Sequence, residues 1–561
     1  MQDDDWGTEW DEVVDVIVVG SGAAGLAAAL AASREGLKVT VLERADTLGG
    51  TTAKSGGGVW VPNNSLMRAA GLSDCRDDAL RYLARLGYPT RYNPETTNLG
   101  LSSNEYELLT TFYDKGPGVL DELSGLGAIY PELVGGSEGM PDYHADLPEN
   151  AGIQGRSLRP TVPPGEQAPS ELMGGGRNDY VGGLILVDFM RRAAERQLVN
   201  MRLGHRVVHL LRNENNEVVG VQAETGLRTV LIGSRRGVIF GSGGFLNNRD
   251  RARQFLRGPV FGGTAVETNS GDLIDIAGEV GAQLANMGQA WWDQCVVEVA
   301  IRVPSTAEDI FFPFGDSMIQ VNKYGLRVVN EKQVYNERGQ VHFHWNADKK
   351  EYSNLLLFQI WDEAVAANTD SSIFRRLMPR PGEHADYVIE AENLEDLAAK
   401  IDSRLKTLAP VTGGFHLDQN FISNARETVA RFNRYAEAGQ DPEFGRGESP
   451  IQRVWQGPSR PGLKNPCMAP IDISGPLYAM ILGAGALDTN GGPRINACGQ
   501  ILNGAGSPIP GLYGAGNCIA SPLGQAYPGG GGTLGLALVF GYLAGRCAAG
   551  EGIKRPINVR V

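Results

Sequence analysis

Cysteine is scarce in this chain, with six residues in 561 and no two of them spaced as a Cys-x-x-Cys pair. The scarcity argues against a disulfide scaffold, and the missing pairs argue against a structural zinc site. Basic residues are outnumbered as well, since 51 Lys and Arg face 65 Asp and Glu, for a net charge of −14. A nucleic-acid-binding protein would carry a basic face, so the charge excludes that class of partner.

Long hydrophobic runs are also missing. No run approaches the 18 or more residues of a membrane-spanning helix, and the longest, Leu534 to Gly545, predicts a buried helix of about 12 residues. The first residues, Met1 to Asp5, are acidic where a secretory signal is basic. We therefore expect a cytoplasmic protein in a reducing compartment, with peripheral contact to a membrane left open.

Glycine is the residue in excess. There are 75 glycines, about 13% of the chain against a usual 7% or so. Glycine is used where the backbone turns tightly or approaches a ligand closely, so the excess indicates many such places. The length allows roughly two to four domain-sized units.

The N-terminal part follows the order strand, glycine turn, helix, strand and acid. Val13 to Val19 is typical of a buried parallel strand, and Gly20-Ser21-Gly22-Ala23-Ala24-Gly25 follows at once. Leu26 to Ala32 predicts a helix, and Leu37 to Leu42 predicts a second strand ending at Glu43. This order is that of a dinucleotide-binding unit.

Each part of this motif has a physical role. Gly20 permits the tight turn, Gly22 lets the backbone approach a pyrophosphate, and Gly25 lets helix and strand pack closely. The N-terminus of the helix offers N–H groups and a positive dipole end to the phosphates. Glu43 lies 18 residues past Gly25, where a carboxylate can accept hydrogen bonds from a ribose.

Later segments favour FAD over NAD. Residues 48–52 and 55–57, Leu-Gly-Gly-Thr-Thr and Ser-Gly-Gly, resemble the stretch that FAD-dependent oxidoreductases place along the pyrophosphate and flavin. Glycine turns recur at 236–244 and 511–517, so both ends of the chain would build the site. No Cys or His stands in an attachment motif, which predicts non-covalent FAD. The residues predicted to bind it are Gly20, Gly22, Ala23, Ala24, Gly25, Glu43, Arg44, Gly50, Thr51, Thr52, Ser55, Gly56, Gly57, Gly243, Gly244, Gly516, Asn517, Gly532, Thr533 and Leu534.

The fold predicted from this pattern is α/β. A Rossmann-like FAD-binding domain of the glutathione-reductase type would be formed by residues 1–288 and 486–561, with an inserted α+β catalytic cap domain at 289–485. Within these limits, residues 393–408 and 423–438 predict helices, and Leu273 to Ala285 predicts a helix capped at residues 270–272.

Other stretches predict less regular structure. Residues 93–175 and 442–470 are expected to be loop-rich. His342 and His344, two residues apart, would share one face of a strand, where a plain structural pair is favoured over a metal site.

Three further segments carry a family resemblance. Residues 521–535 read Ser-Pro-Leu-Gly-Gln-Ala-Tyr-Pro-Gly-Gly-Gly-Gly-Thr-Leu-Gly, residues 141–144 read Pro-Asp-Tyr-His ahead of Gly155-Arg156-Ser157-Leu158, and residues 329–335 read Val-Asn-Glu-Lys-Gln-Val-Tyr. Together with the FAD motif and Trp60-Val61-Pro62, these segments resemble the 3-ketosteroid Δ1-dehydrogenases over essentially the whole chain. The flavin motifs are shared with fumarate reductases, whereas the tyrosines and the Tyr-Pro-Gly-x-Gly turn discriminate.

The resemblance implies a 1,2-desaturation of a 3-ketosteroid. The Tyr527 hydroxyl and the Gly531 N–H would bind the C3 ketone oxygen as an oxyanion hole. Tyr335 would remove the C2 proton while the C1 hydride passes to flavin N5, and Tyr143 would hydrogen-bond Tyr335 and favour its ionised form. An external electron acceptor, a quinone or a dye, would reoxidise the flavin.

The sequence departs from the family at two places, which keeps alternatives open. Gly530 stands where many members have a second proline, and Asp488-Thr489-Asn490-Gly491-Gly492 replaces the usual Gly-Thr-Lys-Gly-Gly. The alternatives are a 3-ketosteroid Δ4-(5α)-dehydrogenase, a desaturase of another cyclic ketone, a fumarate-reductase-like enzyme and a flavin-binding protein without turnover. The Tyr-x-Ser pattern of the Δ4 family and the His-rich segment of the fumarate reductases are both absent.

Overall fold

The chain divides into two compact units. The computed structural model describes residues 10–167, 182–303, 305, 311–370, 375, 377–457 and 459–554, so the predicted acidic start at 1–5 lies outside the described residues. The first unit comprises Met1–Phe255, Ala265–Ala290 and Asp488–Val561, and the second comprises Leu256–Thr264 and Trp291–Leu487. The predicted limits were 288/289 and 485/486, with 256–264 in the first part; strand β10 (Gly262–Gly263) instead pairs with β18 (Leu477–Thr489) of the second unit.

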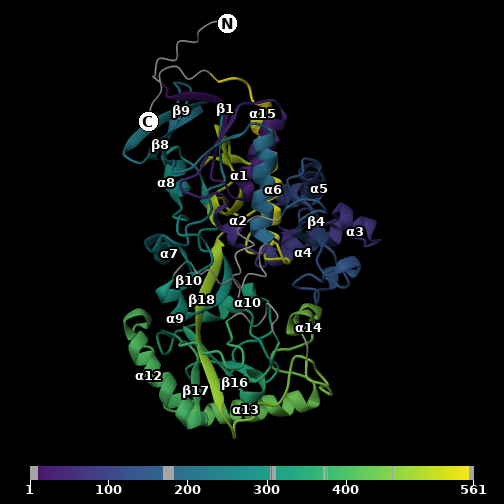
Figure 1. Cartoon of the computed structure of the whole chain (residues 1–561), viewed down its shortest axis with the longest axis vertical. Helices are drawn as coiled ribbons and strands as arrows, with labels where there is room; N and C mark the ends of the chain where they lie inside the picture. Colours follow the sequence, from purple (N-terminus) through teal and green to yellow (C-terminus); the bar gives the residue numbers. More distant parts are fainter. Residues whose placement is uncertain are drawn as a thin grey trace. The chain divides into compact units, whose positions relative to one another are not determined.

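A largely parallel sheet forms the centre of the first unit (Figure 1). Its strands lie in the order β20-β21-β9-β1-β2-β6, and β21, β9, β1, β2 and β6 are mutually parallel. The β-branched residues of β1 (Glu12–Val19) are buried on both faces, as the sequence predicts for a central parallel strand. The other strands of this sheet are β2 (Val39–Leu42), β6 (Asn200–Arg202), β7 (Arg206–Arg212), β8 (Val218–Thr225), β9 (Arg228–Phe240), β20 (Gln500–Leu502) and β21 (Pro508–Gly514).

Helices α1 (Ala23–Arg34) and α15 (Gly532–Gly550) pack closely beside this sheet. A β-carbon on Gly541 would lie 2.3 Å from Ala24 O, and one on Gly545 would lie 2.2 Å from Ala28 O. Only glycine therefore permits this approach. Among the described residues, α15 is the one helix long and apolar enough to cross a membrane, and most of it is buried inside the unit.

The first unit holds further helices and short strands. They are α2 (Gly50–Lys54), β3 (Val59–Trp60), α3 (Ser65–Ala69), α4 (Arg76–Gly87), α5 (Ser103–Gly125), β4 (Pro131–Leu133), β5 (Ser157–Pro160), α6 (Gly182–Arg196), α7 (Arg249–Phe255), α8 (Asp272–Glu279), β11 (Leu284–Ala285) and β19 (Gly492–Pro493).

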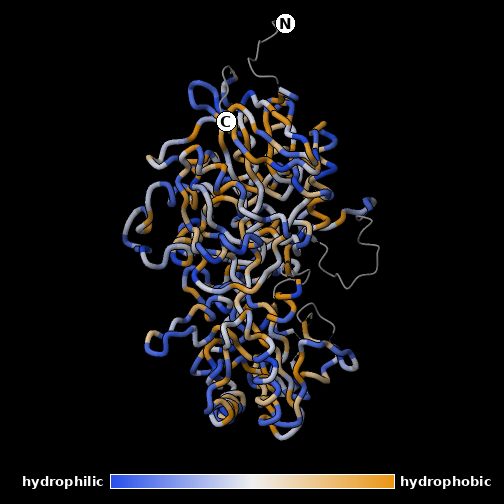
Figure 2. The backbone as a smooth tube through the Cα atoms, turned by 90° about the vertical axis from the view of Figure 1, so that its left-hand side faces the viewer, coloured by the Kyte–Doolittle hydropathy of each residue, from blue (hydrophilic) through white to orange (hydrophobic). Residues whose placement is uncertain are grey.

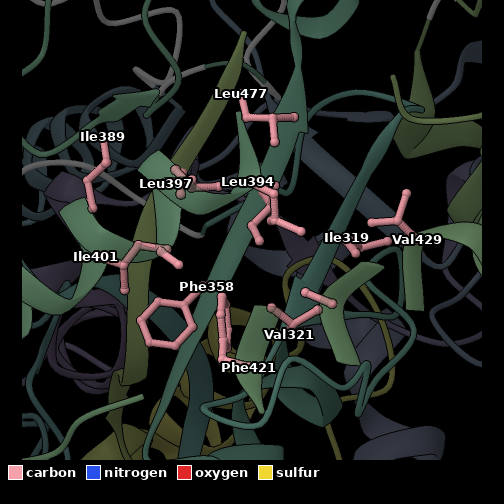
Figure 3. Close-up of a cluster of buried hydrophobic side chains, with 14 of the residues drawn as sticks. Ile319, Val321, Phe358, Ile389, Leu394, Leu397, Ile401, Phe421, Val429 and Leu477 are labelled. Atoms are coloured by element: carbon pink, nitrogen blue, oxygen red, sulfur yellow. The ribbon is translucent and has the colours of Figure 1, made fainter. Parts of the chain in front are cut away.

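The second unit is built on a largely antiparallel sheet, in which β10 pairs in parallel with β18, and two long helices lie against it. Strand β18 pairs with β10, β12 (Ala290–Val296), β16 (Leu356–Asp362) and β17 (Ile389–Ala391), and β13 (Met318–Val321) extends the sheet beyond β16. Helices α12 (Leu394–Thr412) and α13 (Phe421–Ala438) contribute Leu397, Ile401, Phe421 and Val429 to a buried cluster with Phe358 of the sheet (Figure 3). The remaining elements are α9 (Val297–Arg302), α10 (Tyr335–Gln340), β14 (Trp345–Asn346), β15 (Glu351–Tyr352), α11 (Glu363–Ala366) and α14 (Pro450–Gln456).

Several predicted elements were wrong. The predicted loop-rich region 93–175, whose residues 168–175 lie outside the described residues, contains the 23-residue helix α5. The helix begins with a capping box at Ser102 and Glu105, and Pro117 between two glycines makes it hard to recognise from the sequence. Helix α14 interrupts the predicted loop 442–470. Helix α8 ends at Glu279 rather than Ala285, because Gly278 lies in its last turn and Gly281, with φ +78°, follows it. Its N-cap is Gly271, which has no side chain to cap with.

Two further predictions needed correction. The last helix is 19 residues long, from Gly532 to Gly550, because packing against α1 extends it past the apolar run. Cys498 and Cys547, 49 residues apart in sequence, are joined as a disulfide, a pair that spacing alone does not reveal. Short hydrophobic and hydrophilic stretches alternate along most of the chain, as Figure 2 shows, so no single run marks the core.

Candidate active site

The turn from β1 into α1 requires glycine at two positions. Gly20 has φ +98°, and a β-carbon there would lie 2.6 Å from Gly241 O. A β-carbon on Gly25 would lie 1.9 Å from Gly20 O, whereas one on Gly22 would meet nothing closer than Thr52 Oγ1 at 3.5 Å. The backbone at Gly22 is therefore open on the side where a pyrophosphate would approach the helix N-terminus.

The acid at the end of β2 is bound by the chain itself. The Glu43 carboxylate accepts hydrogen bonds from Ser21 N–H at 3.0 Å, from the Ser21 hydroxyl at 2.7 Å and from Ala45 N–H at 2.9 Å. It thus anchors the glycine turn, while its role toward a ribose stays a prediction. Arg44 points to another segment, donating to Thr268 O and the Ser270 hydroxyl.

A buried carboxylate joins several of the predicted FAD segments. Asp488 accepts hydrogen bonds from Gly244 N–H at 2.9 Å, Asn269 Nδ2 at 2.7 Å, Asn517 Nδ2 at 3.2 Å and Thr489 N–H at 2.8 Å. Burial raises the pKa of Asp488 to about 6, against the N–H donors that favour the charged form. The sequence marked residue 488 only as a departure from a family pattern.

The segment after β2 belongs to the same assembly. Thr51 Oγ1 accepts from Asn269 Nδ2 at 3.2 Å, and Thr52 Oγ1 accepts from Ala23 N–H at 3.1 Å. Nothing in a sequence marks a lone Asn such as Asn269, so its part in this network was missed. The Gly56–Gly57 backbone lies against the start of α6, where a β-carbon on Gly182 would be 2.1 Å from Gly56 O.

Two helix N-termini are staggered along this region. Gly541 and Gly545 of α15 contact Ala24 and Ala28 of α1, so the helices run parallel. Helix α15 begins nine residues before Gly541, and α1 begins one residue before Ala24, so the start of α15, near Thr533 and Leu534, lies about 12 Å ahead of the start of α1. Two positive dipole ends along one line suit an elongated anionic dinucleotide.

An orphaned polar atom also fits a bound cofactor. The side-chain amide of Asn490 is buried, and its Nδ2 has no hydrogen-bond partner among the described residues. Buried donors without a partner are rare in native proteins, where a ligand, an ion or an ordered water satisfies them. Together, the open backbone at Gly22 and the buried amide of Asn490 make this region of the first unit suitable for binding FAD.

Two of the predicted tyrosines lie together. The rings of Tyr143 and Tyr527 stack with centroids 5.6 Å apart and planes 8° from parallel, and both residues are buried. The Tyr143 N–H donates to Pro528 O at 3.2 Å, and the Tyr82 hydroxyl donates to the same oxygen at 2.5 Å. The turn that follows Tyr527 is therefore fixed from two sides.

A buried ion network supports this pair of tyrosines. The Arg156 guanidinium is fully buried and contacts Asp142 at 2.7 Å and Asp74 at 2.6 Å. Asp142 also accepts from Trp60 Nε1 at 2.7 Å. Asp142 is next to Tyr143 in sequence, so the network holds that segment in place. In the sequence, Arg156 is recognisable only as part of a motif, and no role could be predicted for it.

The glycine turn 529–532 is packed rather than loose. A β-carbon on Gly529 would lie 2.5 Å from the Trp60 ring, and Gly531 has φ +98° with its β-carbon position 2.3 Å from Gly58 C. The Gly531 N–H makes no hydrogen bond among the described residues. It is a preorganised donor beside the two tyrosines, as an oxyanion hole requires.

Tyr335 lies in the second unit, as the first residue of α10. It is buried, with its ring stacked on Trp455 at 6.0 Å and edge-on to Phe312 at 6.3 Å. Arg338, one turn further along α10, is buried and interacts electrostatically with Tyr335. A nearby guanidinium favours the phenolate form of a tyrosine. The predicted hydrogen bond between Tyr143 and Tyr335 would join the two units and stays a prediction.

The histidine pair does not share a strand. His342 lies in a 3-10 helix at Val341–Phe343, where it contacts Gln294 Nε2 at 3.1 Å and Asn354 O at 2.8 Å. Burial lowers the pKa of His342 to about 4, so it is neutral at physiological pH. No group of three or more metal-ligating residues occurs in the described part of the chain.

Comparison with known proteins gives the family. The sequence profile of the FAD binding domain family matches residues 15–534. A 3-oxosteroid 1-dehydrogenase of Mycolicibacterium smegmatis is 32% identical over 94% of this chain and 96% of its own length. A 4-oxocyclohexanecarboxylate 2-dehydrogenase of Sinomonas cyclohexanicum is 30% identical over 96% of this chain and 93% of its own.

A solved structure is similar as well. The 3-ketosteroid Δ1-dehydrogenase of Sterolibacterium denitrificans, in complex with 1,4-androstadiene-3,17-dione, has a TM-score of 0.79 and 27% identity, covering 96% of this chain and all of that one. The match over most of the sequence and the arrangement of the glycine turns lead to one conclusion. The chain belongs to the FAD binding domain family and is an FAD-dependent oxidoreductase.

Proposed function

We propose that this enzyme introduces the C1–C2 double bond of a 3-ketosteroid. The observation that carries the proposal is the stacked pair Tyr143 and Tyr527 beside the N–H of Gly531, which makes no hydrogen bond to any residue that the structure describes. The similarity to the dehydrogenases of Mycolicibacterium smegmatis and Sterolibacterium denitrificans supports it. In this proposal the FAD-binding domain is of the glutathione-reductase type and the second unit is the catalytic cap.

The chain's residues would divide the chemistry between them. The Tyr527 hydroxyl and the Gly531 N–H would donate hydrogen bonds to the ketone oxygen and stabilise the charge that develops there. Tyr335 would remove the C2 proton, with Tyr143 favouring its ionised form. FAD, when bound, supplies the acceptor for the C1 hydride and its electron pair.

The base needs electrostatic help. A free tyrosine has a pKa near 10, so lowering it by two or three units requires roughly 3–4 kcal/mol. The buried guanidinium of Arg338 on the same helix would contribute to that stabilisation of the phenolate. A hydrogen bond from Tyr143 would add to it.

A second candidate is the desaturation of a smaller cyclic ketone. It is favoured by the similarity to the Sinomonas 4-oxocyclohexanecarboxylate 2-dehydrogenase, which matches as much of this chain as the steroid enzymes do. A cyclohexanone and a steroid A-ring both carry a ketone with hydrogens on the adjacent carbons. The same donors and base would serve either substrate.

Anaerobic mixing with candidate substrates tests the proposal. The purified holoenzyme is mixed with androst-4-ene-3,17-dione, a 5α-saturated 3-ketosteroid or 4-oxocyclohexanecarboxylate, and flavin absorbance is followed. Bleaching by the 4-ene with a 1,4-diene product is the expected result. Bleaching by the cyclohexanone alone favours the second candidate, and a 4-ene product from the saturated steroid favours Δ4-(5α)-dehydrogenation. If none of the three compounds bleaches the flavin, the proposal is contradicted and a flavin-binding protein without turnover is favoured.

The cellular setting follows as part of the same proposal. We place the enzyme in the cytoplasm, with a quinone as the external electron acceptor. A lipid-soluble steroid and a quinone both partition into membranes, which would bring the enzyme to a membrane surface. Sedimentation with liposomes tests that contact.

A further inference from the structure

Ser157, at the start of β5, carries an unexplained hydroxyl. The residue is fully buried, and its Oγ has no hydrogen-bond partner among the described residues. Ser234 of β9 shows the normal situation, since it is equally buried and its hydroxyl lies 2.7 Å from Gly237 O and 3.0 Å from Asp15 O. Thr40 and Ser449 also carry buried hydroxyls without a partner among the described residues, so the unpaired state alone does not identify a site. The position of the Ser157 hydroxyl in the fold is what points to a ligand.

The Ser157 hydroxyl faces the glycine turn next to the stacked tyrosines. The point where a β-carbon on Gly530 would lie is 3.6 Å from Ser157 Oγ, 3.4 Å from the Tyr143 hydroxyl and 3.3 Å from Met140 Cε. The next residue along the chain is Gly531, whose N–H donates no hydrogen bond within the described ranges. The two hydroxyls therefore lie on one side of this turn, next to the residue that carries this N–H.

One strand residue fixes the geometry of these donors. Trp60 of β3 pairs with Ser157 of β5, and its N–H donates to Gly531 O at 3.0 Å. Ser157 and Gly531 are thus both held against the same backbone. Such a rigid support is what a preorganised donor set needs.

We propose that the Ser157 hydroxyl is a further binding group of the ketone site, donating a hydrogen bond to the substrate oxygen that the Gly531 N–H also binds. The inference rests on the proposed function, because it takes the ligand to be a ketone. A serine has one O–H to donate, and the hydrogen bond that it makes becomes stronger as negative charge develops on the acceptor oxygen. Ser157 would therefore bind the enolate-like state more tightly than the ketone.

The test compares Ser157→Ala with the matched control Ser234→Ala in the FAD-loaded enzyme. Para-substituted phenols, whose phenolate oxygen imitates the enolate, are titrated while flavin absorbance is followed, and the thermal midpoint of each variant is measured. For Ser157→Ala we expect phenol affinity to fall about 10- to 100-fold, most for the most acidic phenol. Its thermal midpoint should equal or exceed that of the wild type, since no intramolecular hydrogen bond is lost.

Ser234→Ala should give the reverse, a lower midpoint with unchanged phenol affinity. A second variant, Gly530→Ala, puts a methyl group between the two hydroxyls and should weaken phenol binding as well. Wild-type phenol affinity in Ser157→Ala would overturn the inference, and so would a loss of stability like that of Ser234→Ala. If no ketosteroid is turned over but Ser157→Ala still weakens phenolate binding, the proposed substrate fails and the oxygen site stands.

Discussion

At the scale of single residues, Tyr335 carries the most specific prediction. Tyr335→Phe should retain FAD while the rate of flavin reduction by substrate falls on the order of 10²- to 10⁴-fold, because the proton acceptor is removed. Stopped-flow absorbance on the holoenzyme measures it. Tyr478→Phe is the control, since Tyr478 is in the same unit and its hydroxyl donates to Glu363 at 2.6 Å. A Tyr335→Phe rate near that of the wild type would place the base elsewhere.

Asp488 carries a prediction about pH. Its folded pKa of about 6 lies above the unfolded value of about 3.9, so its contribution to stability is fully present below pH 4 and is lost as pH rises through 6. The loss amounts to about 3 kcal/mol at pH 7. In the FAD-free protein, the unfolding free energy of Asp488→Asn minus that of the wild type should rise by this amount between pH 4 and 7.

The control for Asp488 is a carboxyl group whose pKa is shifted in the opposite direction. At Asp316 burial opposes ionisation, but the hydrogen bonds and charge of Arg460 hold the pKa below its ordinary value. Asp316→Asn should therefore give a difference that falls as pH rises through the acidic range. If the difference in unfolding free energy between variant and wild type changed with pH in the same direction for both variants, the opposite pKa shifts of Asp488 and Asp316 would be contradicted. Urea titrations at a series of pH values measure both.

At the scale of elements, the close packing of α1 and α15 is the feature to test. Gly541→Ala would bring a methyl group within 2.3 Å of Ala24 O, so we expect α15 to be displaced at a cost of about 1–3 kcal/mol, with weaker FAD binding. Gly550→Ala on the same helix meets nothing within 4 Å and should be neutral or slightly stabilising. Denaturant midpoints and FAD titrations distinguish the two variants. Equal behaviour would show that the helix contact is unimportant.

Elements could be predicted from the sequence where local pattern and burial agree. The predicted strand, helix and strand at 13–42 are confirmed as β1, α1 and β2, and the helices near 393–408 and 423–438 are confirmed as α12 and α13. Helix α5 was missed because Pro117 and its neighbouring glycines have low helix propensity, which packing overrides. The predicted strand at His342 is a 3-10 turn, because two residues are too few to define a period.

At the scale of the whole molecule, FAD should stabilise one unit. Every residue predicted to bind FAD belongs to the first unit, so removing the cofactor should lower the unfolding temperature of that unit and leave the second unchanged. At a free FAD concentration 100 times the dissociation constant, FAD binding should raise the unfolding free energy of the first unit by about 2.7 kcal/mol. Calorimetry of the FAD-free and FAD-loaded protein measures it. Equal shifts in both transitions would contradict the assignment of FAD to the first unit.

The sequence by itself determined the cofactor and the class of chemistry. The strand, glycine turn and helix at 13–34 form a local motif, and local motifs are readable because their residues are neighbours along the chain. The tertiary structure alone decided that Asp488 binds the Gly244 and Asn517 segments and that Tyr143 stacks on Tyr527. It also decided that the Ser157 hydroxyl finds no partner in the part of the chain that the structure describes. These contacts join residues from 29 to several hundred positions apart, and burial and packing, which no local pattern encodes, bring them together.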